Sequence, residues 1–189
     1  GENLLAEGCV NLAYSYIGPR VTQPIYRNGT IGKAKEDLEN TASELMELMR
    51  DKCLGRAYVS VNKAVVTQAS SAIPVVPLYV SLLFKVMRNT GTHEGCIEQI
   101  TRMFNDRLYS EKGAVPVDEK NRIRLDDWEM DSRVQDEVIR AWGTITTENL
   151  DEMTNFREYQ TEFLKLFGFG LEEVNYDEDV DLVDPFKSY

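Results

Sequence analysis

Cysteine and histidine are scarce in this sequence, which has three cysteines and one histidine among its 189 residues. Cys9, Cys53 and Cys96 are odd in number, far apart and without a CxxC spacing, which argues against a disulfide framework and a structural zinc site. We therefore expect no metal site and a reducing, cytoplasmic location. A Ser-His-Asp or Cys-His mechanism would have to use His93, whose position beside Glu94 is more typical of a helix end.

The sequence also lacks long apolar segments and an excess of basic residues. Its longest apolar run, from Ile73 to Phe84, contains Pro74 and Pro77 and is shorter than the roughly 18 residues that a membrane helix requires. Lys and Arg number 21 against 32 Asp and Glu, a formal net charge of −11, which would repel a phosphate backbone. We therefore expect neither a membrane span nor a nucleic-acid partner.

No glycine-rich phosphate loop is present. The patterns GxGxxG, GxxxxGK[ST] and GxSxG do not occur, so the usual phosphate cradles and the nucleophile elbow of hydrolases are excluded. The chain begins Gly-Glu-Asn, without an initiator methionine or the basic and apolar regions of a signal peptide. We expect its first residue to follow a processing boundary, in which case the chain is a fragment.

The first half of the chain alternates strands and helices. Apolar stretches at residues 9–17 and 58–61 are typical of buried strands. A helix is predicted from Thr30 to about Gly55, and a second, almost wholly apolar helix over residues 75–88 must be buried. This order predicts a parallel sheet with a crossover helix, and therefore an α/β protein.

The second half is predicted to be mainly helical. Thr92 is a candidate cap for a helix with one apolar stripe, and Asp131 can begin another helix. Residues 149–167 are helical again, and the acidic tail that follows is expected to be solvated, because it lacks the spacing of an EF-hand. The stripe expected after Thr92 consists of Ile97, Ile100, Phe104 and Leu108.

One candidate catalytic group consists of Tyr16, Tyr26 and Lys35. If Tyr26 lies in the loop before the first helix and Lys35 on its second turn, the ammonium can lean toward the phenol. A nearby cation favours the anionic form of tyrosine, so the pair could act as an acid. The alternative is a surface lysine and a core tyrosine, and spacing alone does not decide between them.

A second candidate is the loop of small residues from Asn62 to Ala72, which follows a predicted strand. Loops at the carboxyl ends of parallel strands bind ligands in open α/β sheets, and small side chains let the backbone approach a flat cofactor ring. The alternative is a tight turn whose Ser and Thr side chains cap the next helix.

Several strings together closely resemble the single-chain bacterial trans-2-enoyl-CoA reductases that use NADH. They are AYSYIGP at residues 13–19, PIY at 24–26 with GKAK at 32–35, VNKA at 61–64 and TQASSAIP at 67–74. In this family, a relative of the short-chain dehydrogenases, the catalytic Tyr and Lys are separated by eight residues, as are Tyr26 and Lys35. The resemblance is dense from about Leu12 to Tyr109 and looser beyond.

The resemblance implies a function and roles for individual residues. The function is NADH-dependent reduction of the trans-2 double bond of enoyl-CoA or enoyl-acyl-carrier-protein thioesters in fatty acid metabolism. Tyr26 would be the proton donor, Lys35 would hold the nicotinamide ribose and support Tyr26, and Tyr16 would contact the substrate thioester. The residues expected to contact the nicotinamide are Ala64, Val65 and Val66, through their backbone, with Thr67 beside them.

The resemblance also implies the organisation of the chain. It corresponds to the C-terminal half of a Rossmann-like parallel sheet with a largely helical second part. We expect a catalytic α/β segment (residues 1–91), a helical region for packing and the substrate side (92–171) and an acidic tail (172–189). The phosphate loop belongs to the N-terminal half of the family's chain, so that half is an expected partner and this chain is expected to be inactive alone.

Two other functions remain compatible with the residues themselves. One is a non-catalytic α/β interaction module whose helical half docks on a partner. The other is a short-chain dehydrogenase that acts on carbonyls.

Overall fold

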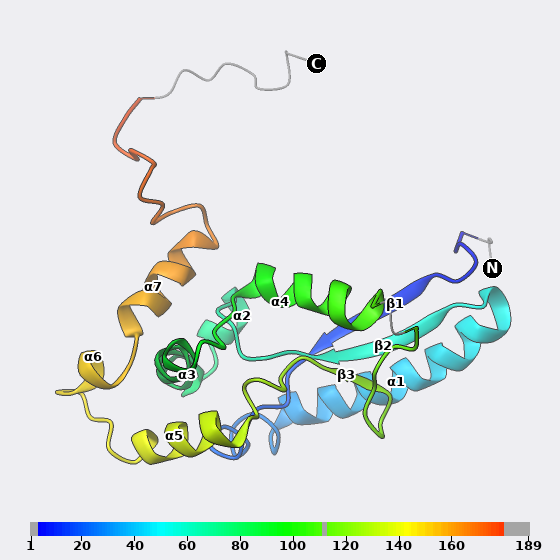
Figure 1. Ribbon diagram of the computed structural model, residues 1–189, viewed down its shortest axis with the longest axis horizontal. Helices are drawn as coiled ribbons and strands as arrows, with labels where there is room; N and C mark the ends of the chain where they lie inside the picture. The colour runs from blue at the N-terminus through cyan, green and yellow to red at the C-terminus, as the bar shows by residue number, and fades with distance from the viewer. Residues whose placement is uncertain (1–3, 111–112, 180–189) are drawn as a thin grey trace.

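The computed structural model describes residues 4–110 and 113–179 and contains one parallel sheet. Its strands are β1 (Val10–Ser15), β2 (Arg56–Val61) and β3 (Arg122–Arg124), in the order β1-β2-β3. Ser15 pairs with Val61, and Val61 pairs with Arg124. All three strands therefore end at the same edge, which brings the loops that follow them together (Figure 1).

The predicted strand, helix and strand of the first half are confirmed. Helix α1 (Thr30–Cys53) connects β1 to β2, and the two strands pair in parallel. The helix ends where Leu54 adopts the left-handed conformation, with φ of 53°. Its Met49 packs inward, whereas Leu48 on the neighbouring face is exposed.

A third strand, β3, was not predicted, and the expectation of only two strands is wrong. The strand has three residues, and two arginines flank its one apolar residue, Ile123. The amides of Leu125 and Asp126 both donate to the carbonyl of Val61, which fixes the chain against the end of β2. Its pairing with β2 thus depends on contacts far apart in sequence, which a three-residue pattern does not reveal.

The apolar helix predicted over residues 75–88 is α3 (Val76–Thr90), and it lies at the centre of the helical half. Tyr79, Val80, Leu83 and Met87 have no exposed surface. Helices α5 (Ser132–Trp142) and α7 (Phe156–Lys165) pack against it, as Figure 1 shows. The short helices α2 (Gln68–Ser71) and α6 (Leu150–Met153) complete this half, with a break between α6 and α7 where one continuous helical stretch was predicted.

Helix α4 (Cys96–Arg102) continues into the π-helical turn η1 (Met103–Leu108). The predicted apolar stripe is largely on the surface, with Ile97 73% exposed. The inward face carries Gln99, Arg102 and Met103 instead. Thr92 does not cap this helix. The N-cap residue is Gly95, whose amide donates to the Glu98 carboxylate at 3.0 Å.

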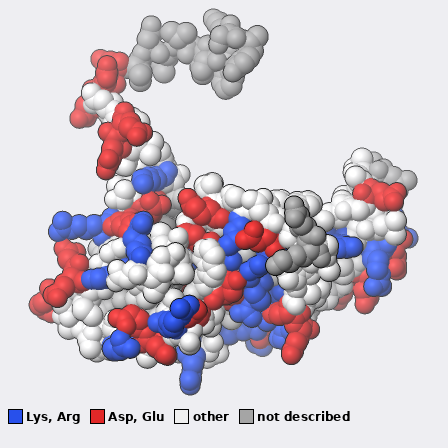
Figure 2. All heavy atoms as spheres, viewed as in Figure 1, with Lys and Arg blue, Asp and Glu red and all other residues white. Residues whose placement is uncertain are grey.

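The C-terminal extension leaves the body of the molecule with its acidic side chains exposed (Figure 2). Residues 172–179 agree with the predicted solvated tail, and residues 180–189 lie outside the described part. Within the described residues, no helix combines the length and the apolar character needed to cross a bilayer.

A close backbone contact positions the segment that carries Tyr26. This segment, between Pro19 and Asn28, folds into consecutive turns and lies directly on the first turn of α1. A Cβ atom on Gly32 would lie 1.7 Å from the carbonyl oxygen of Arg27. Only glycine therefore allows the segment to approach the helix that carries Lys35.

We predict that Gly32→Ala destabilises the chain by about 1–3 kcal/mol, because the backbone of the Arg27 segment must move away. Urea or thermal unfolding measures the change. The matched control is Gly143→Ala, since a Cβ there meets no atom within 4 Å. Equal stabilities of the two variants would contradict this account of the contact.

Candidate active site

A cavity of about 260 Å³ lies at the carboxyl ends of β1 and β2. Six of the seven predicted site residues line it, and they come from the ends of both strands, the Tyr26 segment and α1. They are Tyr16, Tyr26, Lys35, Ala64, Val65 and Thr67. The seventh, Val66, does not line the cavity, because its side chain is buried in the core around α3.

Tyr26 is held in the wall of this cavity by its own turn and by Tyr16. Its amide donates to the carbonyl of Thr22 at 2.9 Å, and its ring meets the Tyr16 ring edge to face with centroids 5.1 Å apart. The side chain is 8% exposed, and this burial raises the pKa of the Tyr26 phenol. Its hydroxyl forms no hydrogen bond with any residue in the described ranges 4–110 and 113–179.

Lys35 lies on the second turn of α1 and is half-buried, which lowers the pKa of its ammonium group. Burial raises the pKa of the Tyr26 phenol, and an effect of the Lys35 cation on the ionisation of Tyr26 stays a prediction. The two groups share a cavity, but they are not paired with each other.

The loop after β2 combines the two interpretations left open by the sequence. Thr67 caps α2, since its hydroxyl accepts from the Ser70 amide at 3.0 Å while the Ser70 hydroxyl accepts from the Thr67 amide at 2.9 Å. The same Ser70 hydroxyl donates to the carbonyl of Val65 at 3.2 Å. The amides of Val65 and Val66 have no acceptor among the described residues. The cap thus fixes the loop, and the amides of Val65 and Val66 stay available to bind a ligand.

The sequence did not single out two buried charged residues, Lys63, which lines the cavity, and Glu129, which lies behind it. Glu129, with no exposed surface, accepts hydrogen bonds from Tyr16, Tyr79 and the amide of Ala64. Lys63, 1% exposed, donates to the carbonyl of Ala64 at 2.8 Å. Glu129 lies in an acidic stretch of sequence, where no pattern distinguishes it from its neighbours. Lys63 could have been recognised, because it is a lysine among the small residues of the loop.

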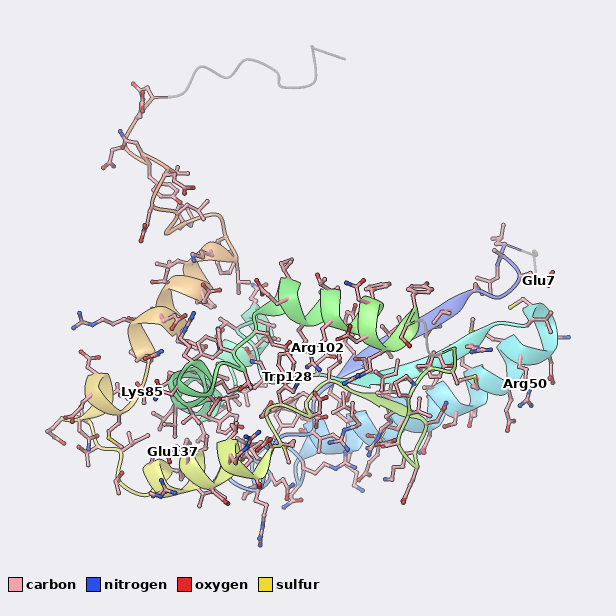
Figure 3. The ribbon with its side chains drawn as sticks, in the orientation of Figure 1. Glu7, Arg50, Lys85, Arg102, Trp128 and Glu137 are labelled. Atoms are coloured by element: carbon pink, nitrogen blue, oxygen red, sulfur yellow. The ribbon has the colours of Figure 1, made fainter. Side chains whose placement is uncertain are left out.

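A second buried charged cluster anchors α4. Arg102 donates to both carboxylate oxygens of Glu94, at 2.9 and 2.7 Å, and to Asp127 at 2.9 Å. Its guanidinium lies 4.1 Å from the ring centre of Trp128, and both side chains point into the space between α4 and β3 (Figure 3). None of these residues lines the cavity, so the cluster serves the fold.

Residues 1–109 match the family model described as the trans-2-enoyl-CoA reductase catalytic region. The chain belongs to the trans-2-enoyl-CoA reductase family. Residues 117–180 match a second model, described as the enoyl reductase FAD binding domain. Together the two matches cover the sheet, the cavity and most of the helical half.

Three relatives illustrate the similarity to this family. The chain is 53% identical over 180 residues to the trans-2-enoyl-CoA reductase [NADH] of Brachyspira hyodysenteriae, which covers 95% of this chain and 46% of that protein. It is 56% identical over 187 residues to the enoyl-[acyl-carrier-protein] reductase [NADH] of Flavobacterium johnsoniae, covering 99% and 47%. The crystal structure of Treponema denticola trans-2-enoyl-CoA reductase in complex with NAD superimposes with a TM-score of 0.86 at 53% identity, covering 94% and 44%.

The chain therefore spans less than half the length of the trans-2-enoyl-CoA reductases that it matches, and it corresponds to their C-terminal half. The predicted α/β fold and its parallel sheet are confirmed.

The residues present do not fit an FAD. A flavin dinucleotide needs cationic groups or backbone donors for its diphosphate. The large open cavity that residues 145–156 share with the start of α3 is lined by apolar and hydroxyl side chains, among them Ile73, Leu78 and Phe156, and by no Lys or Arg. The smaller cavity, by contrast, is lined by Lys35, Lys63 and a loop with free amides.

We predict that His93 stays neutral down to about pH 4. Burial against Phe84 and the charge of Lys63 lower its pKa to about 4. Since this is the only histidine, its imidazole signal in a proton NMR titration is unambiguous. The unfolded chain protonates near pH 6.5, so stability should also decline as the pH falls from there toward 4. A folded-state midpoint at pH 6 or above would contradict the buried, neutral imidazole.

Proposed function

We propose that this chain carries the catalytic residues for NADH-dependent reduction of the trans-2 double bond of enoyl-CoA or enoyl-acyl-carrier-protein thioesters. Membership of the enoyl-CoA reductase family supports the reaction class. The observation that connects this reaction to particular residues is one cavity that Tyr26, Tyr16, Lys35 and a loop with free amides line together. We further propose fatty acid metabolism in the cytoplasm as its setting.

Tyr26 is the proton donor in this proposal. NADH, when bound, supplies a hydride to the β-carbon of the enoyl thioester, and negative charge moves to the carbonyl oxygen. A donor aimed at that oxygen stabilises the charge where it develops. The raised pKa keeps Tyr26 protonated at neutral pH, and its hydroxyl is not committed to another described residue. It can therefore donate its hydrogen.

Lys35 and the loop after β2 form the cofactor side. Lys35 lines the same cavity as Tyr26, where its ammonium would hold the ribose hydroxyls and stabilise the phenolate that proton transfer leaves. The backbone of Ala64, Val65 and Val66 would contact the nicotinamide, with Thr67 beside it. The apolar start of α3 closes the cavity and limits the access of water.

An N-terminal half is the partner that this chain requires. Strand β1 has a neighbour on one side only among the described residues, and its Val10 and Tyr14 are exposed. Such an open edge is a surface for another strand. The sequence also lacks a phosphate loop. We refer to this chain together with the family's N-terminal half as the complete enzyme.

We predict that Tyr26→Phe lowers turnover of crotonyl-CoA by the complete enzyme by at least about a hundredfold. The affinity for NADH should change little, because the ring remains. Tyr58→Phe is the matched control, since Tyr58 is equally buried but lies outside the cavity. Turnover retained within a few-fold would contradict the assignment. Reduction of acetoacetyl-CoA in preference to crotonyl-CoA would indicate a carbonyl reductase instead.

We also predict that this chain alone neither binds NADH tightly nor reduces crotonyl-CoA. Tight binding of a dinucleotide depends on a glycine-rich turn at a helix N-terminus, which the sequence does not contain. Titration with NADH and a parallel turnover assay test this, with and without the added N-terminal half. Micromolar binding and turnover by the chain alone would reveal a phosphate site in these residues and contradict the prediction.

A further inference from the structure

Glu129 lies directly behind the candidate site, in the turn between β3 and α5, with none of its surface exposed. Its Oε1 accepts hydrogen bonds from the hydroxyl of Tyr16 at 2.9 Å and from that of Tyr79 at 2.6 Å. Its Oε2 accepts from the amide of Ala64 at 2.6 Å. One carboxylate thus touches both sides of the cavity without lining it.

The ionised form of Glu129 suits these contacts, because a carboxylate only accepts hydrogen bonds and all three partners are donors. Burial raises the pKa of Glu129, whereas the donors and the charge of Lys63 oppose this rise. Lys63 donates to the carbonyl of the same Ala64 whose amide binds Glu129. Two opposite buried charges therefore hold both backbone polar groups of one residue.

The hydrogen bond to Glu129 distinguishes Tyr16 from Tyr26, two of the three tyrosines that line the cavity. Tyr16 has one hydroxyl hydrogen, which points to Glu129 and cannot at the same time be donated to a substrate oxygen. The hydroxyl of Tyr26 has no such acceptor among the described residues. The resemblance implies that Tyr16 contacts the substrate thioester; the geometry leaves Tyr26, and not Tyr16, with a hydrogen free to donate.

We propose that Glu129 is a positioning residue of the enoyl-reductase site, which holds Tyr16 and Ala64 in register and leaves Tyr26, rather than Tyr16, as the phenol that donates to the substrate. This inference rests on the proposed function. Tyr16 then contacts the substrate through its ring and its hydroxyl oxygen. The Glu129 carboxylate, which binds both Tyr16 and Ala64, fixes the distance between the loop and the Tyr16 ring.

Glu129→Gln in the complete enzyme tests the proposal. The amide of Ala64 can only donate, so the Gln carbonyl must face it and the NH₂ group faces the phenols. Ala64 keeps its contact, but Tyr16 loses the acceptor of its hydrogen. We expect kcat/KM for crotonyl-CoA to fall at least about tenfold while the Kd for NADH changes less than about threefold. Adding Tyr16→Phe should then cost little more, because both changes break the same link.

Asp126→Asn is the matched control, a buried acid in the same turn that pairs with Arg124 at 2.6 and 2.7 Å and lies outside the cavity. If Glu129 only stabilises the turn, both variants should lose thermal stability and keep the kcat/KM of the wild type. A folded Glu129→Gln enzyme with kcat/KM within about twofold of wild type would overturn the proposal, as would fully multiplicative losses with Tyr16→Phe.

Tyr16→Phe and Tyr26→Phe keep the proposal testable if Glu129→Gln does not fold. Because the Tyr16 hydrogen is committed to Glu129, Tyr16→Phe should reduce kcat/KM clearly less than Tyr26→Phe does. Equal losses would overturn the proposal, since both phenols would then be donors. An active Tyr26→Phe enzyme would instead overturn the proposed function, and this inference with it.

Discussion

A carboxylate that water does not reach must find its hydrogen-bond donors within the protein, and Glu129 finds them on three separate segments. They are the end of β1 at Tyr16, the loop after β2 at Ala64 and helix α3 at Tyr79. Leaving such a charge without donors would cost several kcal/mol. The three segments must therefore lie close enough to Glu129 to form these hydrogen bonds, and this requirement helps to set the shape of the cavity.

The same physics decides the orientation of α4. Turning the helix to bury Ile97 would gain about 1.5–3 kcal/mol from apolar burial. It would also separate Arg102 from Glu94 and Leu125, and breaking a buried ion pair costs about 3–5 kcal/mol. The polar face therefore packs inward, and the apolar face of α4 stays exposed in the chain as described.

The site is complete on one side only. The residues proposed for proton transfer and for contact with a nicotinamide ring lie around one cavity, whereas β1 has an open edge among the described residues and the sequence has no phosphate loop. Hydride transfer depends on how well its partners are oriented. A chain of this kind can hold the reactive end of a cofactor in place only if another segment holds its phosphates.

Local patterns determined much of this fold. The spacing of apolar residues predicted α1, α3 and the parallel pair β1 and β2, and the family strings predicted the residues that line the cavity, because each of these features is encoded within a short window of sequence. The structure alone decided that Glu129 is buried, that β3 joins the sheet and that α4 turns its polar face inward. Each depends on contacts between distant segments, such as Glu129 with Tyr16 across 113 positions. At Glu129 and in α4 the free energy of satisfying a buried charge outweighs the local hydrophobic pattern, and no short window of sequence contains both Glu129 and Tyr16.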